Sequence, residues 1–347
     1  MAPFFVKILT QIARRFSWKP AGCVLSLESL EASHGVASKR DATSLVGAQA
    51  SSHPLTVVEL VDGKIIGDLR MVATAGDIVV GGLQGLFGCP DPQNHYLLRR
   101  KRFRMLKRRR GTALLLGAAN SDNYYHWLLD SVPRWKMLQA ADWSNYDFVL
   151  LPWCSLQFQD EVLDRLNVPK TKRLRCSKNF VHQFDRLVVP AMPFPLEEVS
   201  AWACAYVRSL FPEKASGPQK VYLRRGAGRR ELLNQADLEN ALKTLGFVSI
   251  QPDQLSVAEQ ANLLSSARCV VAPHGAALTN LLFAPPGALL LELFHPRHKN
   301  RCYVNIAAAC GHRYIGLDGF SKDRDGEPCL QYTVDVANVL KTLQNAA

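Results

Sequence analysis

Hydrophobic positions after about residue 110 fall into short continuous runs that alternate with segments of helical spacing. TALLLGA, YDFVLLPW and FDRLVVPAM are typical of buried strands, whereas NYYHWLLDSVPRWKMLQAA and FQDEVLDRLNV are typical of helices. The alternation starts again at Lys220 with KVYLRR, NQADLENALKTLGF, VSIQ, SVAEQANLLSSA and RCVVAP. Such alternation predicts parallel sheets with crossover helices. Two series therefore predict an α/β fold of two Rossmann-like lobes, which bind ligands at the carboxyl ends of their strands.

The predicted organisation has two lobes and a terminal helix. Residues 1–212 form the N-terminal lobe, in which β-branched runs and Asp-Gly and Gly-Asp turns over about 53–98 predict a small antiparallel unit. Residues 213–332 form the second lobe, and residues 333–347 form a C-terminal helix. Residues 1 to about 20 predict an amphipathic helix that either packs on the protein's own core or lies on a membrane surface. The Ser-, Ala- and Gly-rich segment 32–52 predicts an exposed loop.

Composition narrows the protein class. The chain has 347 residues, of which 48% are hydrophobic and 21% charged, so we expect a folded globular protein. Its net charge of +12 favours an anionic partner such as nucleic acid, an anionic membrane or a phosphorylated substrate. Nine cysteines without a C-x-x-C pair indicate a reduced compartment and no zinc site. The apolar stretch near the N-terminus is too short to span a bilayer, and basic residues follow it, so we expect a cytoplasmic protein.

A basic run, RRKRFRMLKRRR, occupies residues 99–110. Three interpretations of this run remain open: it is a plain solvent-exposed surface, it binds an anionic membrane, or it binds an acidic acceptor. Nucleic acid is not expected, because no RNP, zinc-finger or helix-turn-helix signature accompanies the run.

The first candidate site is NYYHWLLDSVPRW. On a helix, His126 and Asp130 lie on one face, with Asn123 one turn earlier and Arg134 one turn later. Trp127 faces elsewhere. Four kinds of functional group on one stripe favour a catalytic helix, and the alternative is an amphipathic helix with a core histidine.

The second candidate site is VYLRRGAGRRELLN. A strand that ends in Arg224, followed by a glycine-containing loop and Arg230, places guanidinium groups where they can bind a phosphate bidentately. The alternative is a charged surface hairpin, because this loop matches no Walker or dinucleotide fingerprint.

The third candidate site is VVAPHGAALTNLLFAPPGALLLELF, residues 270–294. It predicts strand, turn, helix and strand, with His274 at the first strand end and small residues at Gly275 and Ala276. Small residues before a helix N-terminus suit a diphosphate, since they allow close approach to unpaired N–H groups. Asn280 lies on the helix. Glu292, within an apolar strand, requires a partner and is expected to bind the ribose hydroxyls of a nucleotide.

In this order the three motifs resemble glycosyltransferase family 61 over roughly residues 110–295. The resemblance implies a GT-B architecture, an inverting reaction, a nucleotide-diphosphate sugar as donor, and no cofactor or obligatory metal. The implied site has three parts: catalytic His126 or Asp130, acceptor or positioning residues Asn123, Trp127 and Arg134, and donor-binding Arg224, Arg230, Asn234, His274, Gly275, Ala276, Asn280 and Glu292.

The chain departs from eukaryotic members in that no N-terminal signal anchor is evident. A bacterial-type enzyme that acts on capsular polysaccharide or lipopolysaccharide precursors is therefore expected, cytoplasmic or peripheral at the inner membrane. The rival is a noncatalytic protein that binds nucleic acid or membrane through residues 99–110. An epimerase or dehydrogenase is disfavoured, because no G-x-G-x-x-G follows a strand.

Overall fold

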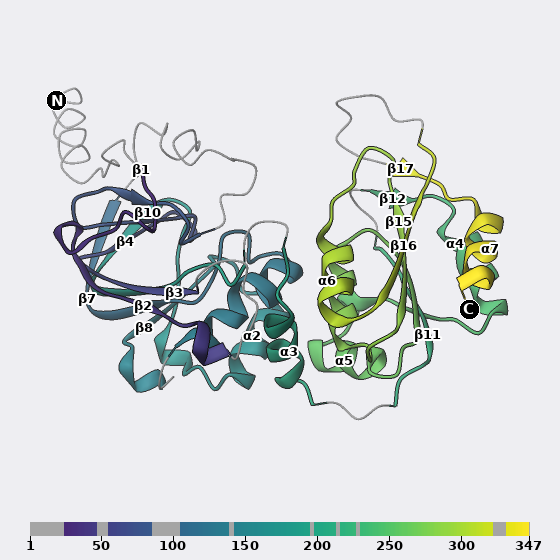
Figure 1. The fold of residues 1–347 in the computed structure, drawn as a ribbon, viewed down its shortest axis with the longest axis horizontal. Coiled ribbons are helices and arrows are strands. Elements are labelled where there is room, and N and C mark those ends of the chain that lie inside the picture. Colours follow the sequence, from purple (N-terminus) through teal and green to yellow (C-terminus); the bar gives the residue numbers. More distant parts are fainter. Residues whose placement is uncertain are drawn as a thin grey trace, which may run out of the picture. The chain divides into compact units, whose positions relative to one another are not determined.

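Two compact units make up the chain, residues 1–196 and 197–347 (Figure 1). The computed structural model describes residues 24–46, 55–84, 105–138, 142–194, 198–212, 216–226, 230–321 and 331–346. Helix α3 (Ala201–Ser209), which the sequence analysis assigned to the first lobe, lies in the second unit. Its Arg208 donates from Nε to the carbonyl of Leu282 at 2.6 Å, which ties the helix to that unit.

The first unit is built on a ten-stranded sheet. Its strands are β1 (Val24–Leu25), β2 (Val36–Asp41), β3 (Thr56–Val61), β4 (Lys64–Ile66), β5 (Met71–Ala73), β6 (Val79–Val80), β7 (Met105–Leu115), β8 (Phe148–Leu151), β9 (Arg173–Arg175) and β10 (Phe180–Pro190). Its helices and helical turns are η1 (Ala32–His34), η2 (Thr43–Val46), η4 (His126–Ser131), η5 (Val132–Met137), η6 (Trp143–Asn145), α2 (Gln157–Arg165) and η7 (Lys170–Lys172).

The strand order is β1-β6-β5-β4-β10-β7-β8-β9, with β3 also on β10 and β2 on β3. Strands β10, β7, β8 and β9 are mutually parallel, as predicted. The predicted antiparallel unit is present as β3 to β6, but β3 and β4 pair antiparallel with β10 and so extend the main sheet. The prediction of an exposed loop over residues 32–52 was wrong in part, since this segment contains β2, which pairs with β3.

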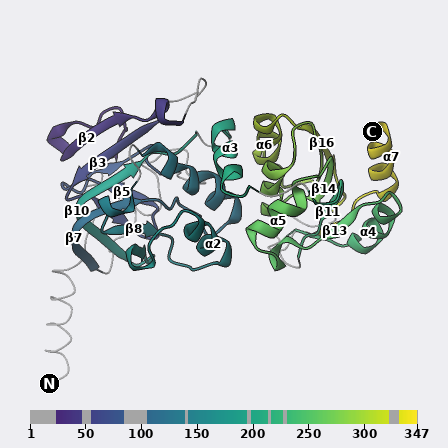
Figure 2. The same ribbon diagram turned by 90° about the horizontal axis from the view of Figure 1, so that it is seen from below.

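The second unit is a doubly wound α/β layer. Its strands are β11 (Lys220–Leu223), β12 (Glu231–Leu232), β13 (Val248–Ile250), β14 (Cys269–Pro273), β15 (Leu289–Phe294), β16 (Arg313–Asp318) and β17 (Gln331–Tyr332). Besides α3, its helices are α4 (Gln235–Thr244), η8 (Pro252–Gln254), α5 (Val257–Leu264), η9 (Ala276–Phe283), α6 (Cys302–Cys310) and α7 (Val336–Ala346). Within this unit α4 and α7 cover one face of the sheet, and α5 and α6 cover the other (Figures 1 and 2).

The order of the main sheet in this unit is β13-β11-β14-β15-β16, and every pair is parallel. From β11 the chain moves to β13 on one side and then to β14 on the other. This reversal is a topological switch point, where the connections leave the sheet in opposite directions and open a crevice at the carboxyl ends of the strands. Strand β15 is buried at all six positions, as its LLLELF sequence predicts for a strand covered on both faces.

Half of the basic run lies in strand β7, and residues 99–104 lie outside the described part of the chain. Arg108 pairs with Asp62, with Nη2 and Oδ1 3.0 Å apart. Lys107 Nζ lies 3.8 Å from the ring centre of Phe180. Two of the basic side chains therefore contact residues of the same unit, Asp62 in the turn after β3 and Phe180 on β10. The predicted N-terminal amphipathic helix also lies outside the described residues.

In the described part of the chain no helix has the length and apolar character to cross a bilayer. The described cysteines form no disulfide bond with one another.

His182 on β10 makes the first unit sensitive to acid. It is 3% exposed, and burial, followed by the charges of Arg109 and Lys107, lowers its pKa from 6.5 to about 4. Because the unfolded state binds the proton first, stability is full above pH 6.5 and falls as the pH drops towards 4. At about 1.4 kcal/mol per pKa unit, the loss of stability over this range is roughly 3 kcal/mol.

The test is urea unfolding of the wild type and His182→Phe at the two ends of this pH range. We expect the variant to lose less stability on acidification than the wild type. Equal losses in the two proteins would contradict this role of His182.

Candidate active site

In the first unit, the carboxyl end of β7 leads into an unusual helix. The sequence predicts a regular α-helix here. The structure instead has a π-helix, η4, which is followed directly by the 3-10 turn η5. The Val132 N–H donates to the carbonyl of Trp127, five residues earlier, and Pro133 lies in the first turn of η5. π-Turns are rare and are frequent at functional sites, so the backbone geometry supports this segment as a candidate.

His126 and Asp130 form a hydrogen-bonded pair on η4. Nδ1 of His126 and Oδ2 of Asp130 are 2.7 Å apart, and their side chains are 21% and 3% exposed. A carboxylate that accepts the Nδ1 proton fixes the imidazole tautomer and leaves Nε2 as the basic nitrogen. The pair therefore has the geometry of an oriented general base.

The remaining residues of the predicted stripe lie in other surroundings. Trp127 is completely buried in the core. Asn123 is exposed, and its Oδ1 accepts the N–H of Tyr125 at 2.9 Å. The buried Arg134 donates from Nε to the carbonyl of Asp130 at 3.1 Å, and burial lowers its pKa to about 10. Arg134 thus holds the backbone of Asp130 in place.

A polar network holds this helix to the neighbouring loops. Ser131 Oγ lies 2.6 Å from Ser121 Oγ and accepts the Ala118 N–H at 2.9 Å. The buried Gln159 on α2 donates from Nε2 to the carbonyl of Ser121 at 2.7 Å. Its Oε1 accepts from Arg175 Nη1 at 3.0 Å. The network thus runs from the edge strand β9 through α2 to the loop before His126.

In the second unit, Arg225 and His274 follow the two strands at the switch point. Arg225 Nη1 donates to the carbonyl of His274 at 2.5 Å. A Cβ at Gly275 would clash with the same nitrogen, so any other residue there would displace the end of the flexible Arg225 side chain. Ala276 and Ala277 are partly exposed and begin η9, whose first N–H groups have no acceptor within the helix.

Glu292 on β15 orients His274. Its side chain has no exposed surface, and its two oxygens bond with His274 Nδ1 and with Tyr314, whose hydroxyl donates at 2.7 Å. On the other side of the imidazole, Asn300 Nδ2 lies 3.1 Å from His274 Nε2. The predicted partner of the buried carboxylate is therefore His274. The expected contact of Glu292 with a ribose stays a prediction, and in this structure both carboxylate oxygens bond within the protein.

The guanidinium groups of Arg225 and Arg230 give this end of the sheet a positive potential. Burial, followed by the charge of Arg230, with smaller effects from nearby residues that include Arg225, lowers the pKa of His298 from 6.5 to about 4. His298 is therefore neutral at physiological pH, and its ring lies 5.4 Å from that of His274.

Three predicted donor residues make contacts that tie elements together. Arg224 Nε lies 2.8 Å from Glu239 Oε1 on α4. Asn234 exchanges hydrogen bonds with the backbone of Val334 at 2.8 and 3.1 Å. The buried Asn280 donates from Nδ2 to Gln260 Oε1 at 2.6 Å. The structure thus brings together His274, Gly275, Ala276 and Glu292, and adds Arg225, Tyr314 and Asn300.

Among the residues that the structure describes, no group of three or more His, Cys, Asp or Glu side chains is arranged to hold a metal ion. The described residues offer an imidazole–carboxylate pair in one unit and a switch point with two nearby guanidinium groups in the other.

Residues 124–291 match a protein-family model described as Glycosyltransferase 61. This segment, just under half of the chain, is similar to the Glycosyltransferase 61 family. It contains η4, with the His126–Asp130 pair, and the switch point of the second unit. The resemblance that the three motifs indicate is thus confirmed.

Curated relatives carry the same kind of name. The chain is 35% identical over 98 residues to the EGF domain-specific O-linked N-acetylglucosamine transferase of Gallus gallus. The aligned segment covers 27% of this chain and 18% of that protein. It is 30% identical over 141 residues to the protein of that name in Canis lupus familiaris, covering 36% and 27%. It is 30% identical over 103 residues to the protein O-linked-mannose beta-1,4-N-acetylglucosaminyltransferase 2 of Tetraodon nigroviridis, covering 28% and 18%. The matches span about a quarter or less of each relative.

Proposed function

We propose that the protein is an inverting glycosyltransferase that moves a sugar from a nucleotide-diphosphate donor to an acceptor hydroxyl. The observation that carries this proposal is the position of Arg225 beside Gly275 at the switch point, inside a segment of family 61. Ligands of doubly wound sheets bind at such points, and a guanidinium group beside a helix N-terminus suits a diphosphate.

The second unit binds the donor. Arg225, the nearby Arg230 and the first N–H groups of η9 stabilise the diphosphate as it leaves with the electron pair of the broken C–O bond. These groups are fixed before the reaction, so they stabilise the developing charge without reorganisation. Glu292 and Tyr314 position His274 behind this site.

The first unit supplies the base. His126 Nε2 takes the proton of the acceptor hydroxyl while the hydroxyl oxygen attacks the anomeric carbon from the face opposite the diphosphate. Asp130 holds the imidazole tautomer and stabilises the imidazolium that forms. The displacement inverts the anomeric configuration, needs no metal in this scheme, and uses the two units as the donor and acceptor lobes of a GT-B enzyme.

The names of the relatives support N-acetylglucosamine as the first donor sugar to test. For the acceptor we propose a hydroxyl of a polysaccharide or lipopolysaccharide precursor. In the same scheme the enzyme works in the cytoplasm, and residues 99–110 bind the anionic inner membrane, in keeping with the net charge of +12.

The proposal is tested by the release of nucleoside diphosphate from the N-acetylglucosamine donors of uridine, guanosine and cytidine. Each donor is incubated with extracts of capsular polysaccharide or lipopolysaccharide precursors, or with an EGF-like domain. We expect release from one donor that increases with the glycan precursors. Absence of release from every donor would overturn the proposed activity, whereas stimulation by the EGF-like domain alone would overturn the proposed acceptor.

A further inference from the structure

Trp153 presents an exposed indole at the carboxyl end of β8. Tryptophan has the largest apolar surface to bury, yet this side chain remains 50% exposed. Its only described ring contact is with Lys178, whose Nζ lies 4.7 Å from the ring centre. About half of the surface of this side chain therefore contributes no hydrophobic stabilisation to the folded state.

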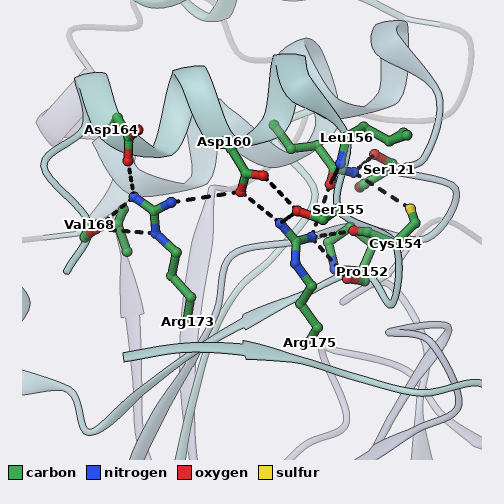
Figure 3. Close-up of polar contacts among 11 residues, drawn as sticks. Ser121, Pro152, Cys154, Ser155, Leu156, Asp160, Asp164, Val168, Arg173 and Arg175 are labelled. Atoms are coloured by element: carbon green, nitrogen blue, oxygen red, sulfur yellow. Dashed lines mark hydrogen bonds and ion pairs between the residues drawn. The ribbon is translucent and has the colours of Figure 1, made fainter. Parts of the chain in front are cut away.

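The loop that carries Trp153 is held rigidly. Arg175 donates to the carbonyls on both sides of it, at Pro152 (3.3 Å) and Cys154 (Figure 3). The same guanidinium group donates to Ser155 Oγ at 2.9 Å and to Asp160 Oδ1 at 2.8 Å. The backbone on either side of the exposed indole is thus anchored, so little conformational entropy remains to be lost when a ligand binds.

Polar groups of the loop after β7 lie next to this loop. Gln159 links the two loops, because its Nε2 bonds with the carbonyl of Ser121 at 2.7 Å and lies 3.9 Å from Cys154 Sγ. The following residues, Asp122 and Asn123, are exposed. Burial, followed by the charge of Asp122, raises the pKa of the Cys154 thiol, so this carboxylate lies near the residue that follows Trp153.

We propose that Trp153 is the stacking platform of an acceptor subsite for a sugar ring. A pyranose presents an apolar C–H face that packs on an aromatic ring, and hydroxyls at its edge that hydrogen-bond to carboxylate and amide groups. Asp122 and Asn123, on the neighbouring loop, are the residues we assign to those hydrogen bonds. This inference rests on the proposed function, since it assigns the acceptor side of the same reaction.

The test is saturation-transfer NMR with methyl glycosides of glucose, galactose, mannose and N-acetylglucosamine at millimolar concentration. We compare the full chain with Trp153→Ala, Trp153→Phe and Phe320→Ala. Phe320 is the matched control, because it is an aromatic residue of the second unit that is 66% exposed. Both positions are exposed, so the variants are expected to fold.

At least one glycoside is expected to bind the wild type and the Phe320→Ala variant equally. Trp153→Ala is expected to bind it about tenfold more weakly, and Trp153→Phe to retain most of the affinity. Binding of no glycoside to the wild type, or equal binding to wild type and Trp153→Ala, overturns the subsite. Nucleoside diphosphate binding by the same proteins is measured in parallel, and its absence counts against the proposed function rather than against Trp153.

Discussion

His126→Ala is expected to lower the rate of sugar transfer by about 10²- to 10⁴-fold, the usual contribution of a general base. His126 is the partly exposed member of the pair, and its Nδ1 is held by the buried Asp130 at 2.7 Å. The variant removes the proton acceptor from the first unit and leaves the switch point of the second unit untouched. Steady-state transfer rates and calorimetric titration with the nucleoside diphosphate, on the same preparations, separate the two effects.

Asp130→Asn is the matched control for the base. The amide retains the size of the carboxylate but not its charge, so the imidazole remains while its tautomer and imidazolium form lose support. We expect a transfer rate between those of the wild type and His126→Ala. A wild-type rate for His126→Ala would exclude His126 as the base.

Arg225→Ala is expected to weaken nucleoside diphosphate binding by roughly 10- to 100-fold, because a hydrogen bond to a charged group contributes about 1.5–3 kcal/mol. The guanidinium lies over Gly275 and bonds with the carbonyl of His274, at the switch point of the parallel sheet. Calorimetry with the nucleoside diphosphate measures the loss, and melting temperatures report whether the variant is folded.

Arg224→Ala is the control for this change. It removes the same kind of side chain one residue earlier, but that guanidinium pairs with Glu239 on α4. We expect near wild-type nucleotide affinity. If the Arg224 variant lost binding and the Arg225 variant kept it, the diphosphate site would have to be moved to the α4 side of β11.

The choice between these two arginines illustrates what the sequence does and does not determine. The hydrophobic run of β11 predicts a strand that ends at a ligand-binding edge, and the structure has that strand. Arg224 and Arg225 follow the last residue of β11, and their side chains go to different partners, Glu239 on α4 and the carbonyl of His274. Which of the two faces the switch point depends on the packing of α4 and η9, which lie later in the chain.

Glu292 shows the same limit for a buried charge. Its place in an apolar strand predicts that it needs a partner. The partners come from the neighbouring strands, since Glu292 lies in register with Ala272 on β14 and Gly316 on β16, each two residues from a residue that bonds with Glu292. Residues two apart share a face, which places His274 and Tyr314 beside the carboxylate. Register is a tertiary property that strand patterns alone leave open.

Helical periodicity predicts the contact between His126 and Asp130, although η4 is a π-helix and not the regular helix expected. The π-turn cannot be inferred from spacing, because Asn123, His126 and Asp130 fit a regular helix equally well. The central role of β10 is also absent from the sequence pattern. Its pairing with β3, β4 and β7 joins segments that are far apart in the chain.

The central claim is that the switch point between β11 and β14 binds a nucleoside diphosphate. Isothermal titration calorimetry of the wild type with UDP, GDP and CDP tests it most directly, with Arg225→Ala and His126→Ala titrated alongside. One of the three ligands is expected to bind the wild type and His126→Ala with equal affinity, and Arg225→Ala far more weakly. Absence of binding by all three nucleotides, or binding that Arg225→Ala leaves unchanged, would contradict the claim.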